Sequence, residues 1–206
     1  MREREQIIEL FNTSEFEQAR KSVGDLYKVP RTGWLNHGIG KDKAETVGEH
    51  TDSMIALFES VIDEIDPDKE FDRNRMIRII QIHDWAEGNP DVGDRVTVIY
   101  SGEKEKQLVA QKKSDELKAM ESICSKLGNE GEDVMKLWLE FEEQSTPEGK
   151  LLKEMDKLQA VLKAYEYEQY GTDVRAREFI DNIKKRNQVT NSVLVEIMSE
   201  VESKCK

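Results

Sequence analysis

The sequence predicts an all-α protein that folds as a single bundle of helices. Most of the chain carries apolar residues three and four positions apart, which is the spacing of one face of an α-helix. Alternation with a period of two, which is typical of half-buried strands, is scarce. A chain of 206 residues with 37% hydrophobic residues is long enough to bury one substantial core. We therefore expect one domain over residues 1–206.

Local signals set the boundaries of the expected helices. Thr46 and Glu49 have the spacing of a capping box, so a helix is expected to begin at the next residue, Val47. Gly128-Asn129 is typical of a helix end, and Thr146-Pro147 is typical of a helix start. Helices are expected over residues 2–12, 15–27, 47–65, 73–85, 103–127, 131–143, 147–170 and 175–185, with a last one from residue 190.

Two segments outside the central helices are expected to pack over them. Residues 91–102 form the main irregular stretch, and its apolar side chains are expected to cover a pocket as a lid: Val96, Val98, Ile99 and Tyr100. The helices after Gly171 have apolar positions that either pack on the core or contact another subunit: Phe179, Ile180, Ile183, Val193, Leu194, Ile197, Met198 and Val201. The pattern alone does not distinguish these two uses.

Three expected helices each carry a polar side chain on or beside their apolar face. His50 and His83 continue apolar stripes, Asp84 follows His83 directly, and Asp156 borders a third stripe. The stripes consist of Val47, Met54, Leu57, Phe58, Val61 and Ile65; Met76, Ile79 and Ile80; and Leu151, Leu152, Met155, Leu158, Leu162 and Tyr165. A buried carboxylate is costly unless it is paired or binds a cation. Two imidazoles and two carboxylates suit a borderline divalent metal with open positions for water, which predicts a metal-dependent hydrolase.

A single histidine on an apolar helix face is usually a core residue that is hydrogen-bonded to backbone. Here two of the three histidines in the chain lie on such faces, and acidic residues accompany them. The joint pattern favours the metal site. The third histidine, His37, lies in a glycine-containing segment that is expected to be a loop.

Several short motifs occur in the order seen in the HD-domain phosphohydrolases, and the set resembles the YfbR-like 5'-deoxynucleotidase branch. The motifs are Arg31-Thr32-Gly33-Trp34, Glu45-Thr46-Val47-Gly48-Glu49-His50, His83-Asp84-Trp85-Ala86-Glu87, Gly93-Asp94 and Asp156-Lys157-Leu158. The similarity spans roughly residues 26–170, so residues 171–206 are expected to be a C-terminal helical extension of an HD domain. Related proteins are often dimers, which favours a homodimer.

The resemblance implies roles for individual residues. One divalent ion is expected, with Mn, Co, Fe, Mg and Zn all open, held by four ligands: His50, His83, Asp84 and Asp156. Arg31 is expected to bind the substrate phosphate, because its planar guanidinium holds phosphate oxygens bidentately. Trp34 is expected near the sugar, where an aromatic residue favours deoxyribose in similar proteins. Glu87 and Asp94 are expected to handle water and proton transfer, or to hold a second ion.

This chain departs from the usual family pattern in two loops. It is about two residues longer between Trp34 and His50, and again between Glu87 and Gly93-Asp94. The second difference leaves Asp91 as a competitor for the role expected of Asp94. Taken singly, the accessory residues have ordinary alternatives: a core aromatic for Trp34, a surface cation for Arg31, an exposed helix end for Glu87 and a turn residue for Asp94.

Charge and cysteine content restrict the classes of partner. The net charge of −12 argues against binding to a nucleic-acid polymer or an anionic membrane, so a small-molecule nucleotide is the expected substrate. Cys124 and Cys205 give no disulfide framework, which fits a reducing compartment. We expect neither an export signal nor a membrane-spanning segment, and a cytoplasmic protein.

Three other functions are alternatives to a deoxynucleotidase. A nucleoside triphosphohydrolase needs extra cations for the longer anion, and Arg95, Lys104 and Lys106 are candidates. A ppGpp hydrolase also uses an HD core, but the acidic pair that follows its HD motif is replaced here by Trp85-Ala86-Glu87. A metal that only joins the helices of a binding protein is the third alternative, although structural sites usually close their ligand shell, often with thiolates.

Overall fold

The described residues of the computed structural model are 21, 23–96 and 102–205, and their regular elements are all helical. The α-helices are α3 (Thr32–Asn36), α4 (Val47–Ile65), α5 (Arg73–Ile82), α6 (Glu103–Cys124), α7 (Gly131–Glu143), α8 (Pro147–Gln169), α9 (Ala176–Arg186) and α10 (Ser192–Lys204). Short 3-10 helices span Leu26–Lys28 (η1), Trp85–Gly88 (η2) and Gly128–Glu130 (η3). The all-α prediction is confirmed. The helix expected over residues 2–12 and most of that over 15–27 lie outside the described residues.

Side-chain caps fix the beginnings of the three central helices. The capping box expected at Thr46 is present, because the Thr46 side chain accepts a hydrogen bond from the Glu49 backbone while the Glu49 side chain accepts one from the Thr46 backbone. Asp72 caps α5 in the same position, and Thr146 caps α8 ahead of Pro147. Each helix therefore begins at a defined residue, which fixes the rotation of its apolar face.

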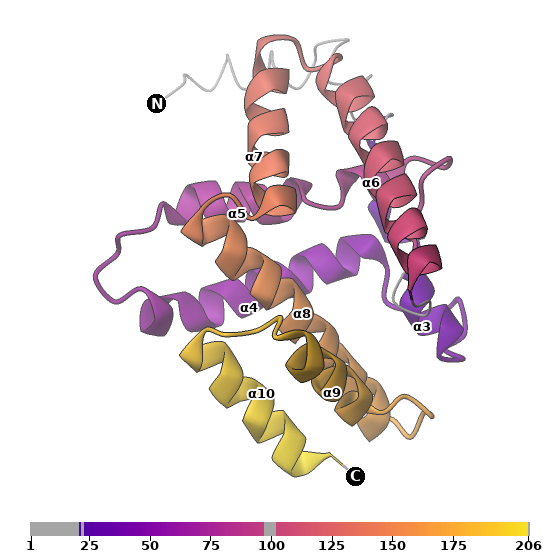
Figure 1. Ribbon diagram of the computed structural model, residues 1–206, viewed down its shortest axis with the longest axis vertical. Coiled ribbons are helices and arrows are strands. Elements are labelled where there is room, and N and C mark those ends of the chain that lie inside the picture. The colour runs from indigo at the N-terminus through magenta and orange to yellow at the C-terminus, as the bar shows by residue number, and fades with distance from the viewer. Residues whose placement is uncertain (1–20, 22, 97–101, 206) are drawn as a thin grey trace.

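The core lies where α4, α5, α7 and α8 pack against one another. In Figure 1, α8 crosses α4 obliquely, α5 lies beside α4, and α6 and α7 stand at one side of this layer. The side chains that fill the centre are fully buried: Phe58, Met76, Ile79, Ile80, Leu152, Met155 and Leu158. On the opposite side, α9 and α10 pack against α8, and α10 also contacts α4. The C-terminal helices thus cover the central layer within the same chain.

The structure ends α5 at Ile82, three residues before the expected end at residue 85. His83 is the C-cap, and the chain continues through Asp84 into the 3-10 helix η2. The cause is a tertiary contact, because the Trp138 indole N–H of α7 donates a hydrogen bond to the His83 carbonyl oxygen at 3.1 Å. Because α5 has ended before it, Asp84 does not continue the helical face of α5.

The segment around residue 34, expected to be irregular, contains the short helix α3. Its first residue is held from outside, since the Asp94 side chain accepts a hydrogen bond from the Thr32 backbone N–H and the Asp94 carbonyl accepts one from the Thr32 hydroxyl. These partners lie 62 positions apart in the sequence. Of the expected lid, Val96 is described and lines a cavity, whereas Val98, Ile99 and Tyr100 lie outside the described residues.

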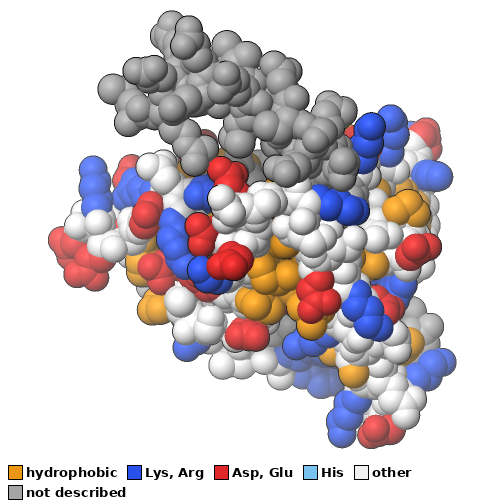
Figure 2. All heavy atoms as spheres, turned by 90° about the horizontal axis from the view of Figure 1, so that it is seen from above, with side chains coloured by type: hydrophobic (Ala, Val, Ile, Leu, Met, Phe, Trp, Pro, Cys, Tyr) orange, Lys and Arg blue, Asp and Glu red, His pale blue; other side chains and the backbone are white. Residues whose placement is uncertain are grey.

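Acidic and basic side chains lie interspersed on the face seen in Figure 2, and apolar side chains gather near its centre. Although the net charge is −12, the acidic side chains do not form one continuous patch on this face. Among the described helices, none combines the length and the hydropathy that crossing a membrane requires.

Candidate metal centre and substrate pocket

Three helices bring two histidines and one aspartate together. His50 lies in the first turn of α4, His83 caps the end of α5, and Asp156 lies in the first half of α8. One ligand atom from each of the three lies within 4.8 Å of the others, and all three residues are buried. The expected convergence of these residues is therefore present in the structure.

Asp84 lies at the edge of this cluster. Its Oδ2 is 3.0 Å from His83 Nε2 and 3.8 Å from His50 Nε2, and its side chain is 19% exposed. Asp156 Oδ1 lies 3.2 Å from His50 Nε2. The Nε2 atoms of both histidines thus face carboxylate oxygens.

Both of these nitrogens are buried atoms without a hydrogen-bond partner in the part of the chain that the structure describes. On the other side of each ring, Nδ1 has an oxygen partner: the Ile80 carbonyl for His83 at 2.6 Å, and Gln159 Oε1 for His50 at 2.7 Å. A neutral imidazole that donates from Nδ1 to this oxygen keeps a lone pair on Nε2.

A nitrogen lone pair and a carboxylate oxygen that face each other repel unless a cation lies between them. Burial opposes protonation of His83, yet the Asp84 carboxylate raises its pKa above the ordinary value, which indicates a position that attracts positive charge. A carbonyl or amide oxygen behind the ring is the usual support of a metal-bound histidine. The donor set of two imidazole nitrogens and carboxylate oxygens fits a borderline divalent ion.

The two carboxylates of this centre are held in their ionised forms. Burial would raise the pKa of Asp156, but Lys157 and His50 lower it well below its usual value. Lys157 Nζ contacts the outer oxygen, Oδ2, at 2.7 Å, which leaves Oδ1 facing His50. Burial would also raise the pKa of Asp84, but His83 lowers it below its usual value. Both side chains are therefore negatively charged over the ordinary pH range.

A cavity of about 320 Å³ opens beside the cluster. Every sequence-predicted site residue except His50 lines it: Arg31, Trp34, His83, Asp84, Glu87, Asp94 and Asp156. Asp91, the competitor for the role of Asp94, is exposed and is not among the lining residues. His37 is exposed and stacks against Phe179, and it does not line this cavity either.

Arg31 enters the cavity beside His50. Its Nη1 lies 2.7 Å from His50 Nδ1, 3.5 Å from Gln159 Oε1 and 3.7 Å from Glu45 Oε2. Burial would lower the pKa of Arg31, but the surrounding carboxylates, Asp156 foremost, raise it. The guanidinium is therefore a permanent positive charge beside the carboxylates of the pocket.

Glu87 is buried at the turn that follows the His83-Asp84 pair, with a side chain only 7% exposed. Burial raises its pKa well above the usual value, and repulsion from Asp84 adds to the rise. Lys112 of α6 opposes this shift, because its Nζ lies 3.1 Å from Glu87 Oε1 and 3.3 Å from Glu116. A carboxyl group with a raised pKa holds its proton to higher pH than usual, which suits general acid/base catalysis.

Sequence reasoning did not identify Lys112 as part of the pocket. Its spacing to Glu116 is that of an i,i+4 ion pair, which on a charged helix indicates a solvated face. Only the contact with Glu87, 25 positions away, places Lys112 at the cavity. No signal in the sequence distinguishes it from the other lysines of α6.

Trp34 and Asp94 have contacts that tie them to the fold as well as to the cavity. Trp34 is 3% exposed, its indole N–H donates to Glu45 Oε2 at 3.0 Å, and its ring packs edge-on against Tyr167. It is therefore a core aromatic whose surface also lines the pocket. Asp94 anchors α3 through Thr32 and lines the same cavity as Glu87.

The cations that a longer phosphate chain would require are only partly at the cavity. Arg95 lines it, but its Nη1 pairs with Asp115 at 2.7 Å. Lys104 and Lys106 are not among the lining residues. Four other lysines line the cavity: Lys112, Lys113, Lys153 and Lys157.

Residues 23–198 match a family model described as the HD domain. The chain belongs to the HD-domain family. Curated relatives include the 5'-deoxynucleotidase HDDC2 of Danio rerio, which is 34% identical over 79% of this chain and 74% of the relative. The 5'-deoxynucleotidase HDDC2 of Xenopus laevis is 35% identical over 74% and 69%, and that of Homo sapiens is 30% identical over 90% and 84%.

Two solved structures share the fold of this chain. A conserved hypothetical protein from Pyrococcus furiosus superposes with a TM-score of 0.69 at 25% identity, covering 95% of this chain and 99% of the other. A predicted metal-dependent phosphohydrolase from Magnetospirillum magnetotacticum reaches a TM-score of 0.68 at 18% identity, covering 93% of each chain. These likenesses support the all-α architecture described above.

Proposed function

We propose that this protein is a metal-dependent 5'-deoxynucleotidase that hydrolyses deoxyribonucleoside 5'-monophosphates to deoxynucleoside and phosphate. The observation that carries the proposal is the pair of buried Nε2 atoms of His50 and His83, which face the carboxylates of Asp84 and Asp156 without a hydrogen-bond partner among the described residues. The names of the curated relatives, which are 5'-deoxynucleotidases, support the choice of substrate.

The proposed ligands of the divalent ion are His50, His83, Asp84 and Asp156. One ion is proposed, and its identity stays open among Mn, Co, Fe, Mg and Zn, because nitrogen and oxygen ligands serve all of them. When bound, such an ion supplies Lewis acidity that polarises a phosphate and makes water more acidic.

The pocket residues then divide the remaining work. Arg31 holds the phosphate and neutralises charge that builds on the transferring phosphoryl group, because its guanidinium stays protonated. Glu87 is the first candidate for general acid/base catalysis, since its raised pKa allows it to accept a proton from water or to donate one to the leaving 5'-oxygen. Asp94 and Trp34 line the same cavity, where Asp94 would assist Glu87 and Trp34 would border the sugar.

The remaining properties follow from charge and from the resemblance. A small-molecule nucleotide is the proposed partner, not a nucleic-acid polymer or a membrane, because the chain is acidic overall while Arg31 and four lysines line the pocket. We also propose a cytoplasmic location, a homodimer and a single domain, the last supported by the match over residues 23–198.

The test is a screen of deoxyribo- and ribonucleoside mono- and triphosphates with several divalent ions, with separate measurement of phosphate, pyrophosphate and triphosphate. We expect phosphate release from deoxyribonucleoside monophosphates. Release of triphosphate or pyrophosphate would favour the triphosphohydrolase alternative, which the four lysines around the cavity could serve. Metal binding without cleavage of any phosphate ester would favour a metal that only joins the helices.

A further inference from the structure

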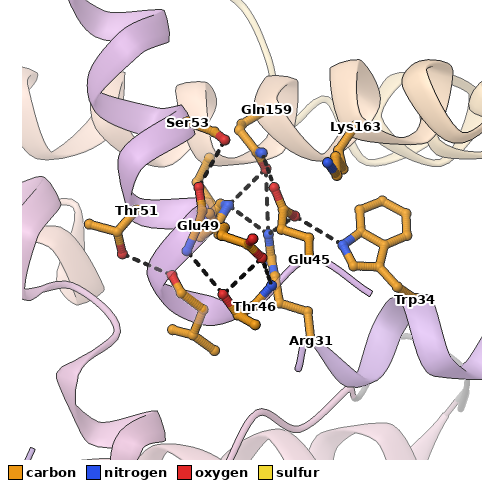
Figure 3. A network of polar contacts seen from close by, with 12 residues as sticks. Arg31, Trp34, Glu45, Thr46, Glu49, Thr51, Ser53, Gln159 and Lys163 are labelled. Carbon is orange, nitrogen blue, oxygen red and sulfur yellow. Dashed lines mark hydrogen bonds and ion pairs between the residues drawn. The ribbon is translucent and has the colours of Figure 1, made fainter. Parts of the chain in front are cut away.

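Behind His50 lies a buried polar pair with no role in the mechanism proposed above. Glu45 precedes the capping box of α4 and is 2% exposed, and Gln159 of α8 is 3% exposed. Figure 3 shows Gln159 reaching from α8 toward Glu45, with Arg31 and Trp34 around the same carboxylate. Buried polar side chains of this kind are costly unless each of their contacts is satisfied.

Glu45 fixes the orientation of the Gln159 amide. Gln159 Nε2 donates a hydrogen bond to Glu45 Oε1 at 2.7 Å, so the NH₂ group faces Glu45. The same carboxylate accepts the Trp34 indole N–H at 3.0 Å through its other oxygen. Gln159 Oε1 is thereby directed toward His50 Nδ1, at 2.7 Å.

An amide oxygen at Nδ1 selects one tautomer of His50. The oxygen can only accept, so Nδ1 carries the proton and Nε2 keeps its lone pair on the side of His83 and Asp156. Arg31 competes for the same atom, since its Nη1 lies 2.7 Å from Nδ1 and a guanidinium can only donate. A hydrogen bond from Arg31 would place the proton on Nε2 and occupy the atom that a metal needs.

We propose that Gln159, oriented by Glu45, is a positioning residue that holds His50 in the tautomer required for metal binding. The inference rests on the proposed metal site. We call the path from Glu45 through Gln159 to His50 the relay. Arg31 and Gln159 both contact Nδ1 of His50, and only the Gln159 contact is compatible with a metal at Nε2. Outer partners of metal-bound histidines act in this way by fixing ring orientation and tautomer.

The first test compares Gln159→Leu with Gln169→Leu, an exposed glutamine on the same helix. Co²⁺ affinity is measured by visible absorption, and the His50 tautomer by ¹⁵N NMR of the metal-free protein, in which only three histidines need assignment. We expect Gln159→Leu to weaken Co²⁺ binding about 10- to 100-fold and to move the His50 proton to Nε2. Gln169→Leu should change neither.

A double substitution separates the relay from packing. Glu45→Gln with Gln159→Glu conserves the total charge and reverses the hydrogen bond, so that the new amide donates to the new carboxylate, whose free oxygen still accepts from Nδ1. We expect this variant to keep the Nδ1–H tautomer and to recover most of the Co²⁺ affinity.

Two results would overturn the inference, and they differ in their consequences. If Gln159→Leu retains the tautomer and binds Co²⁺ within twofold of the unmodified protein, the relay has no positioning role while the proposed function stands. If the unmodified protein binds no Co²⁺, both the relay and the proposed function fail.

Discussion

The side-chain contacts of Glu140 join α5, α7 and the start of α8, and so support the geometry of the metal centre. Glu140 of α7 receives both guanidinium arms of Arg75 from α5, and its Oε1 also accepts the hydroxyl of Thr146, the N-cap of α8, at 2.6 Å. These contacts join α5, whose C-cap is His83, to α8, which carries Asp156. Replacing Glu140 by glutamine removes the charge and keeps the shape.

The expected loss follows from the contacts. Hydrogen bonds to a charged partner contribute roughly 1.5–3 kcal/mol each, but the Arg75 side chain is 38% exposed, so water competes for it, and glutamine retains part of the bonding. We therefore expect Glu140→Gln to lower the free energy of unfolding by about 2 kcal/mol, which for a chain of this size corresponds to a Tm lower by roughly 4–8 °C.

The pH dependence gives the prediction a sign. Burial would raise the pKa of Glu140, but Arg75 and Thr146 lower it below its ordinary value of 4.5. A lowered native pKa contributes stability above the unfolded pKa and loses it as pH falls through the native pKa. The difference between the two proteins should therefore be full at pH 7 and shrink below pH about 4.

Thermal and urea unfolding of the metal-free protein, at pH 7 and below pH about 4, measure this difference. Glu143→Gln, an exposed position on the same helix, is the matched control and should leave Tm within about 1 °C. A Glu140→Gln variant as stable as the unmodified protein at pH 7, or a loss that does not change with pH, would refute the reasoning.

Three further predictions concern the site. Asp84→Ala should lose both its metal and its phosphate release, whereas Glu87→Ala should keep its metal and lose kcat roughly 10²- to 10⁴-fold. Elemental analysis together with a phosphate assay distinguishes the two variants. Loss of metal in both would contradict the prediction. Lys112→Met should destabilise the metal-free protein by roughly 1–3 kcal/mol in thermal unfolding, and an equal effect of Lys113→Met, its exposed neighbour, would count against the Glu87 contact. Mn²⁺ at one hundred times its Kd should add about 2.7 kcal/mol of stability, and His83→Ala should abolish that gain.

The helices could be predicted because their signals are local. The capping box at Thr46 and the proline after Thr146 gave the starts of α4 and α8 to the residue. With those starts fixed, the apolar spacing placed His50 and Asp156 on inward faces, and the structure brings them together. This part of the site depends only on helix periodicity.

The rest depends on contacts between residues far apart in the sequence. The end of α5 is set by Trp138, which lies 55 positions beyond the carbonyl that it binds. Lys112 belongs to a helix that its composition indicates to be solvated, and only Glu87 draws it into the pocket. Gln159 was open to prediction, since it follows Asp156 by three positions and so shares its face.

The most direct measurement of the central claim is anomalous diffraction from crystals grown with Mn²⁺. We predict a peak between Nε2 of His50 and Nε2 of His83, within bonding distance of an Asp156 oxygen. A crystal structure in which the two imidazoles point apart, or in which Mn²⁺ binds only at other places on the protein, would contradict the metal centre and the hydrolysis that we derive from it.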